Sequence, residues 1–201
     1  MAEFPTKSPG EVVTAADWNQ IGDYVDDRTS ILAEGLEPSS GEFVFAVTSE
    51  MRANFQAIRF VGFGRSGAGT GTFRNVSVTV NGDSGDNYYG HRLESRDDIS
   101  PNPRINEGLV VNAAIVAMVP APPASPPSSI GQYEFTVTGL QDGQSELIQG
   151  SGGFQSGGST YGRVIAAQFR RNNSDACTEV RVVPVTADWT SASRLSVYGV
   201  R

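Results

Sequence analysis

Four oxygen-bearing side chains occur close together near the middle of the chain: Asn81, Asp83, Asp86 and Asn87. Carboxylate and amide oxygens are the ligands that Ca²⁺ and Mg²⁺ take in proteins, so the group is a candidate site for a structural ion. It is not an EF-hand, because the twelve-residue spacing and the closing Glu are absent. Asn, Asp and Gly are also the residues of a tight turn, since they tolerate positive φ or hydrogen-bond to their own backbone. A turn without an ion and a turn with a bound ion are both open interpretations, and no other cofactor is expected.

A second acidic group comprises Glu94, Asp97 and Asp98, with Arg92 and Arg96 beside it. Paired carboxylates can hydrolyse glycosidic bonds when about 5 to 9.5 Å separates them across a cleft. The sequence fixes no such separation, and loop charges neutralised by the two arginines explain the same residues. The chain has no Gly-x-Ser-x-Gly elbow, P-loop or histidine-based triad. We therefore expect a protein that is not an enzyme.

Three aromatic residues with polar neighbours are candidates for stacking on a sugar ring: Tyr88, Tyr89 and Trp189. Tyr88 and Tyr89 are adjacent, so in a strand one side chain points inward and the other outward. The alternation also places several aromatic side chains in the core. Glycan binding and core packing are the two interpretations of these residues.

The single histidine and the single cysteine indicate no site of their own. His91 has no His or Cys partner for a zinc site. Cys177 lies in a strand-like stretch and is expected to be a small buried apolar residue. One cysteine also allows no disulfide within the chain.

Ten short segments have the composition and alternation of β-strands. Clusters of Gly, Ser, Pro and Asn separate them, as at 64–71, which reads as a hairpin loop, and at 120–129 and 150–158. This spacing predicts a mainly β protein, an antiparallel β-sandwich of jelly-roll type. The expected strands are 43–47, 58–63, 73–80, 87–93, 109–118, 131–138, 145–149, 161–170, 178–184 and 193–200.

The proline-rich stretch 120–127 cannot lie inside a sheet, because proline lacks an N–H and has a fixed φ. It is expected to be an exposed, polyproline-like loop. A stiff connection between sheets and a ligand for an aromatic groove on a partner are both open.

An N-terminal arm and helix are expected before the strands. Residues 1–13 indicate an extended arm, and Thr14 is a suitable N-cap for a helix that ends near Gly35. The predicted division is therefore 1–36 for attachment and oligomerisation, a linker at 37–41, and a β-sandwich domain at 41–201.

The apolar residues of this helix recur at spacings of three, four and seven, and they are Trp18, Ile21, Val25 and Leu32. Such a narrow stripe is typical of a helix that associates with copies of itself, here around a threefold axis. The alternative is a helix that packs on its own sandwich.

The net charge of −7 and the content of one lysine, Lys7, among 15 basic residues indicate a high-salt host or a GC-rich genome. An acidic surface argues against nucleic acid as the main partner, because phosphate binding needs basic side chains. No apolar stretch approaches the roughly 20 residues that span a bilayer, and no signal peptide is visible. No membrane insertion is expected.

Three segments resemble parts of tail, baseplate and fibre proteins of tailed viruses, which infect bacteria or haloarchaea. Residues 8–19 resemble the opening pattern PG-x-V-x-TA-x-x-x-N, residues 81–88 the turn NGD-x-G-x-NY, and residues 194–201 the closing strand that ends in YG-x-R or YG-x-K. They lie at the start, middle and end of the chain, so the resemblance spans its length.

The resemblance implies a virion structural protein that assembles through its N-terminal region and displays a β-sandwich in host attachment. Expected partners are further copies in a homotrimer, other virion proteins, and a host surface glycan or protein. A capsid fibre, spike or decoration protein would use the same modules. A glycan-degrading enzyme on the same scaffold is the alternative from a different class.

Overall fold

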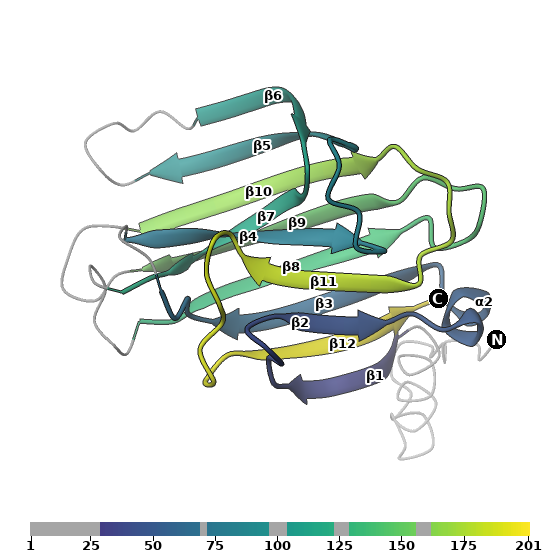
Figure 1. Cartoon of the computed structure of the whole chain (residues 1–201), viewed down its shortest axis with the longest axis horizontal. Coiled ribbons are helices and arrows are strands. Elements are labelled where there is room, and N and C mark those ends of the chain that lie inside the picture. The colour runs from purple at the N-terminus through teal and green to yellow at the C-terminus, as the bar shows by residue number, and fades with distance from the viewer. Residues whose placement is uncertain (1–28, 69–71, 97–103, 123–128, 156–161) are drawn as a thin grey trace, which may run out of the picture.

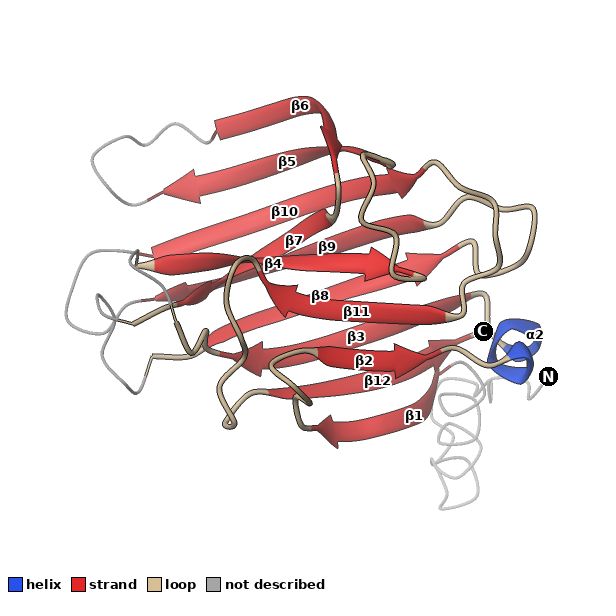
Figure 2. Ribbon diagram, in the orientation of Figure 1, coloured by secondary structure: helices blue, strands red, loops and turns tan. Residues whose placement is uncertain are grey.

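The structure is a computed structural model that describes residues 29–68, 72–96, 104–122, 129–155 and 162–201. Within these ranges, twelve strands form two antiparallel sheets that pack face to face, and one short helix lies at an end of the sandwich (Figures 1 and 2). The prediction of a mainly β protein with a β-sandwich fold is confirmed.

The wider sheet has eight strands, and every neighbouring pair in it is antiparallel. From one edge to the other they are β1 (Thr29–Leu36), β12 (Arg194–Val200), β3 (Ala57–Gly64), β8 (Gly131–Thr138), β9 (Leu147–Gln155), β10 (Gly162–Arg171), β5 (Tyr88–Arg96) and β6 (Arg104–Val111).

The narrower sheet has four strands and covers the middle of the wider one, while β5 and β6 extend past it (Figure 1). Its order is β2 (Phe43–Ala46), β11 (Glu179–Pro184), β4 (Phe73–Val80) and β7 (Ala114–Pro120). Helix α2 (Ser49–Asn54) follows β2 and begins where Oγ1 of Thr48 accepts a hydrogen bond from the Met51 N–H at 3.2 Å.

The core lies between the two sheets because strand alternation sends every second side chain there. In β8 the buried residues alternate with exposed or half-buried ones along the whole strand. Phe60 of β3 stacks on Phe135 of β8, with ring centroids 4.6 Å apart, and the edge of Phe45 meets Phe60 from the narrower sheet. Burial of such large apolar side chains is the main stabilising contribution of the fold.

The predicted helix does not extend to Gly35. Residues 29–36 form β1, which pairs with β12 in the register Ile31–Tyr198. Leu32 is therefore a strand residue that packs against the sandwich core and not a member of a helical stripe. Pairing with the last strand outweighs the local helical spacing, and residues 29–36 belong to the sandwich instead of to a separate N-terminal unit. The other predicted stripe residues, Trp18, Ile21 and Val25, lie outside the described residues.

Several loop and strand boundaries also differ from the prediction. Pro120, expected in an exposed loop, ends the edge strand β7, and Ala121 is buried. The expected strand 109–118 is two strands, because the chain bends at Asn112 and passes from β6 in the wider sheet to β7 in the narrower one. Residues 150–155 of the expected loop 150–158 belong to β9. The segment 64–71 is not a hairpin loop, since β3 and β4 lie in different sheets.

The glycines of β9 have a packing role that explains why a glycine-rich stretch forms a strand. A Cβ on Gly150 would lie 2.8 Å from Cβ of Val116, and a Cβ on Gly152 would lie 2.7 Å from Cβ of Ala117. Both distances are too short for carbon atoms that are not bonded. The missing side chains let β7 of the narrower sheet approach β9 closely.

Candidate functional site

The outer face is the side of the wider sheet turned away from the narrower sheet, and no other strand among the described residues lies over it. The arrangement of the two sheets is seen in Figure 1. Strand register aligns its outward side chains in rows across the sheet. One row consists of Tyr198, Arg59, Thr136, Gln149, Gln168 and His91, and the next consists of Ser196, Val61, Glu134, Ser151, Ala166 and Leu93.

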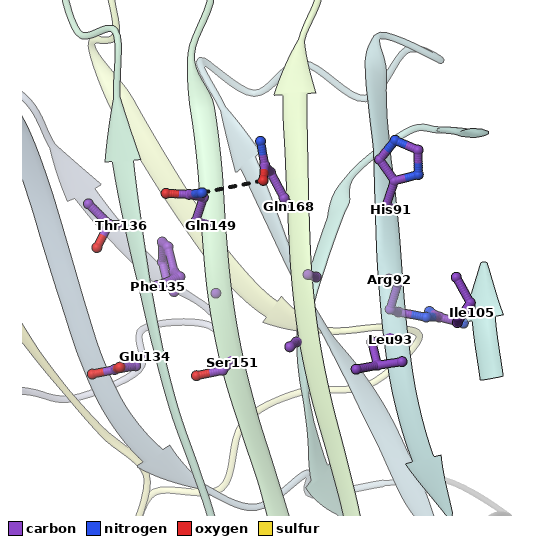
Figure 3. Close-up of a pocket in the computed structure, with 13 residues that line it drawn as sticks. His91, Arg92, Leu93, Ile105, Glu134, Phe135, Thr136, Gln149, Ser151 and Gln168 are labelled. Carbon is purple, nitrogen blue, oxygen red and sulfur yellow. Dashed lines mark hydrogen bonds between the residues drawn. The ribbon is translucent and has the colours of Figure 1, made fainter. Parts of the chain in front are cut away.

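Two hollows that are open to solvent lie side by side on the outer face. The first has a volume of about 660 Å³ and lies over β8, β9, β10 and β5 (Figure 3). The second has a volume of about 1090 Å³ and extends toward β3 and β12. Both are lined by Glu134 and Ser151, so they adjoin each other. Small residues occupy central outward positions in their lining, namely Ser151, Gly153 and Ala166.

The lining of the first hollow is rich in neutral hydrogen-bonding groups. Figure 3 shows the amides of Gln149 and Gln168 pointing toward each other, and Nε2 of Gln149 donates to Oε1 of Gln168 at 3.4 Å. Thr136 lies on one side of this pair, and the exposed His91 lies on the other. Amides, hydroxyls and an imidazole can donate and accept hydrogen bonds without any change of charge.

Glu134 is the one carboxylate among the residues that line the two hollows. Its Oε2 accepts a hydrogen bond from Nη2 of Arg59 at 2.5 Å, and both side chains are half-exposed. Glycosidase chemistry of the usual type requires a second carboxylate across the cleft. The lining thus provides a set of groups suited to holding a ligand.

Large apolar side chains are also concentrated on the outer face. Ten of them are exposed in the described part of the chain, and Val44 of β2 is on the narrower sheet. The other nine lie on the wider sheet or line its hollows, and they are Ile31, Val61, Phe63, Tyr89, Leu93, Ile105, Val110, Ile130 and Val164. Among them, Tyr89 and Val110 are cross-strand neighbours, as are Leu93 and Ile105. Exposed apolar side chains that are contiguous are typical of a binding site.

The predicted ion ligands lie on the turn between β4 and β5, and most of their polar atoms contact protein groups. Oδ1 of Asn81 accepts hydrogen bonds from the backbone N–H groups of Thr178 and Glu179, and its amide donates to the Ala176 carbonyl. The structure therefore accounts for Asn81 without an ion. Asp86 is exposed. The described residues contain no group of three or more His, Cys, Asp and Glu side chains arranged around a common point, and the ion stays a prediction.

Asp83 belongs to a buried ion-pair cluster that joins this turn to β10. Its Oδ2 accepts from Nε of Arg171 at 2.9 Å, and its Oδ1 accepts from the Gly85 N–H and the Asn87 amide at 3.1 Å. Nη1 of Arg171 also donates to both carboxylate oxygens of Glu146, at 3.1 and 3.2 Å. Arg171 and Glu146 are fully buried.

The two carboxylates of this cluster respond differently to burial. Burial raises the pKa of Asp83, but hydrogen bonds from Arg171, Asn87 and Gly85 outweigh it, and its pKa lies below the usual value. Burial raises the pKa of Glu146 above the usual value despite its contact with Arg171. The cluster therefore has a structural role. It connects the turn to β10, and the positive charge of Arg171 lies between the two carboxyl groups.

The aromatic residues proposed for glycan binding separate in the structure. Tyr88 is buried, and its hydroxyl accepts from the Val80 N–H at 2.8 Å, while Tyr89 is exposed on the outer face. One inward and one outward tyrosine were expected, and this is confirmed. Trp189 is buried, stacks on Tyr133 at 5.5 Å and donates from Nε1 to the Val182 carbonyl. Tyr88 and Trp189 are thus core residues, so the prediction that they bind a glycan is wrong, and Tyr89 alone remains a candidate.

Glu94 of the second acidic group is also buried. Nη1 of Arg163 lies 3.1 Å from its Oε1, and Nη2 of Arg92 lies 3.6 Å from its Oε2. Asp97 and Asp98 lie outside the described residues. Glu94 therefore has a charge-balancing role on the side of the sheet opposite the hollows.

Cys177 is fully buried as predicted, and burial raises the pKa of its thiol to about 12. Sequence reasoning did not identify the outer face as a site. The signal was present in the alternation of Gln132, Glu134 and Thr136 with buried aromatics along β8. The row across the strands could not be assembled, because it depends on which strands pair.

No helix in the described ranges is long and apolar enough to cross a membrane. No protein-family model matches this chain, and a comparison with curated proteins finds no similar sequence.

Proposed function

We propose that this chain is a structural protein of a tailed-virus particle, a tail, baseplate or fibre component that acts by binding. The observation that supports a binding role best is the outer face, a sheet surface over which no other described strand lies, with exposed apolar side chains and two adjoining hollows. Surfaces that combine an apolar patch with neutral hydrogen-bonding groups are typical of sites that hold another macromolecule.

The particle assignment depends on the three segments that resemble tailed-virus proteins. Two of them lie at connections within the sandwich. Residues 81–87 link β4 of the narrower sheet to β5 of the wider sheet, and β12 lies between β1 and β3 and pairs with both. A shared pattern at such joints is consistent with a shared sandwich module. The first segment, 8–19, lies outside the described residues.

Host attachment follows from the same resemblance, with the sandwich displayed and a host glycan or protein as its target. Such a target would bind to Tyr89 and to the polar side chains that line the first hollow. The purified full chain should then compete with intact particles for adsorption to host cells. Undiminished adsorption in the presence of excess chain would contradict a role in attachment but not a role in assembly.

The alternative of a glycan-degrading enzyme receives less support from the lining of the hollows, which includes one carboxylate already paired with Arg59. An assay for release of reducing ends from host surface polysaccharide would distinguish the two classes. Turnover that disappears in Glu134→Gln would contradict a role in binding alone.

The direct test of the proposed function is mass spectrometry of purified particles of the virus that encodes the chain. We expect its peptides at a fixed ratio to the major structural proteins through successive purification steps. Immunogold labelling of the tail would separate a tail or fibre component from a capsid fibre, spike or decoration protein. Absence of the peptides from pure particles would overturn the proposal.

A further inference from the structure

We propose that the outer face of the wider sheet is the surface on which a second copy of this chain docks. The inference deepens the proposed function, since it rests on that binding role and names the partner. It places self-association on the described sandwich, independently of the N-terminal residues. Four properties of the outer face support this partner: where the apolar side chains lie, how charge is distributed, how large the surface is, and how its hollows and exposed side chains are arranged.

Seven of the nine exposed apolar side chains of the outer face are aliphatic. Val164 of β10 is 57 % exposed, and it lies beside the hollows together with Val61 and Leu93. Interfaces between protein chains have an apolar centre that is depleted of charge. A sugar would instead favour several aromatic faces gathered over one hollow. Phe63 and Tyr198 line the larger hollow, whereas the exposed Tyr89 lies on β5, with three strands between it and Phe63.

Charge on the outer face is close to balanced, although the whole chain has a net charge of −7. Arg59 pairs with Glu134, and Nη2 of Arg194 lies 2.7 Å from Oε1 of Glu37. In the six strands from β12 to β5, the remaining Arg, Lys, His, Asp and Glu side chains at outward positions are Arg170 and His91. Two acidic molecules repel each other over most of their surfaces, and a nearly neutral face is where they can meet at low electrostatic cost.

The outer face is large enough for a stable contact. Eight strands of about eight residues cover roughly 1,000 Å², from a rise of about 3.3 Å per residue and a spacing of about 4.8 Å between strands. A standard protein interface buries about 800 Å² on each partner. The contact does not need any surface outside this sheet.

The arrangement of the outer face also allows a contact with a copy of itself. The exposed side chains of Val164 and Phe63 line the larger hollow together with the small residues Ser151 and Gly153. In a two-fold contact the same patch is used on both molecules, so exposed apolar side chains of each copy can enter the hollow of the other. Sheets packed in this way lie about 10 Å apart, which leaves room for one layer of side chains from each copy.

The experiment measures the mass of the full chain by sedimentation equilibrium over a concentration series, at molar and at low NaCl. The test variant is Val164→Asp. The matched control is Val44→Asp, the same change at a 45 % exposed valine of the narrower sheet. Circular dichroism confirms that each variant is folded, and Leu93→Asp is a second test variant if Val164→Asp unfolds.

We expect the wild type and Val44→Asp to form an assembly of at least two chains. High salt should strengthen it, because salt screens the repulsion between acidic molecules and favours apolar contacts. Val164→Asp should weaken the association on the order of a hundredfold, since the new carboxylate would be buried at the contact. A monomeric wild type at every concentration and salt would overturn the inference, as would equal mass for Val164→Asp and Val44→Asp.

Failure of the inference and failure of the proposed function have different signatures. A chain that is monomeric in solution but present in purified particles would keep the proposed function and remove the second copy as the partner. A chain that associates through Val164 but is absent from particles would do the opposite. Binding of host surface glycan by a folded monomer, lost in Val164→Asp, would replace the second copy with carbohydrate as the occupant.

Discussion

Tyr88 and Tyr133 are both buried tyrosines, but their hydroxyl groups have different surroundings. The Tyr88 hydroxyl accepts from the Val80 N–H and donates to the Asp83 carbonyl at 3.3 Å. The Tyr133 hydroxyl has no hydrogen-bond partner among the described residues. Burial raises the pKa of both groups above the usual value, that of Tyr88 to about 12. The same side chain therefore stabilises the fold at one position and leaves a polar group unsatisfied at the other.

Replacement of each tyrosine by phenylalanine should change stability in opposite directions. Tyr88→Phe should lower the free energy of unfolding by about 1–2 kcal/mol, because it leaves the Val80 N–H without its partner. Tyr133→Phe should raise the free energy of unfolding by up to about 1 kcal/mol, because it removes a buried hydroxyl that has no partner. Urea denaturation of the two variants beside the wild type measures both changes. A loss of stability in Tyr133→Phe as large as in Tyr88→Phe would contradict these hydrogen-bond assignments.

Because of Asp83, the free energy of unfolding should depend on pH in the acid range. Its pKa is lowered in the folded chain, so its contribution is fully present above the ordinary pKa of about 3.9 and is lost as the pH falls through the folded value. Asp83→Asn should be about 1–3 kcal/mol less stable than the wild type at pH 7, and the difference should shrink on acidification below about pH 4.

The control for this pH dependence is Asp86→Asn in the same turn, where the side chain is exposed. Its free energy of unfolding should stay within about 0.5 kcal/mol of the wild type. Urea denaturation at pH 7, 5 and 3 measures all three proteins. A difference between wild type and Asp83→Asn that is the same at every pH would contradict the assigned pKa shift.

At the scale of elements, β9 and β1 show which features of this fold could be predicted from sequence. The strands 73–80 and 131–138 have the predicted bounds, because alternation and turn residues are local signals. β9 was expected to end before its glycines, because glycine favours loops. In the structure these glycines are strand residues whose missing side chains make room for β7, a long-range contact that the local sequence does not reveal. β1 was expected to be helical, because the partner that makes it a strand is β12 at the other end of the chain.

The role of the β9 glycines can be tested with a single methyl group. Gly150→Ala should lower the free energy of unfolding by about 1–3 kcal/mol, because the new Cβ would overlap Val116 and Phe135, at 2.8 and 2.9 Å. The control is Gly67→Ala, where the nearest atom, the Asp188 carbonyl oxygen, would lie 3.5 Å away. Thermal denaturation compares the two variants. Equal stability of Gly150→Ala and Gly67→Ala would mean that the sheets can separate at β9 without cost.

At the scale of the whole molecule, the wider sheet has one side in the core and the other turned away from it. The narrower sheet covers one of its sides, and the exposed apolar side chains lie almost entirely on the other. The candidate site of the sequence, a turn with Asn and Asp, is a joint between the sheets, because Arg171 and backbone groups engage its side chains. The outer face could not be predicted, since its rows combine residues from strands far apart in the sequence, such as Tyr198 and Arg59.

The most direct test of the account is incorporation into particles. The virus would be grown with the chain supplied as wild type, Val164→Asp or Val44→Asp, and the amount in purified particles measured by mass spectrometry. The account predicts wild-type and Val44→Asp chains at equal levels and Val164→Asp reduced by at least about tenfold, because its outer face carries a charge at the contact. Absence of the wild-type chain from particles would contradict the structural role, and equal incorporation of Val164→Asp would contradict the role of the outer face.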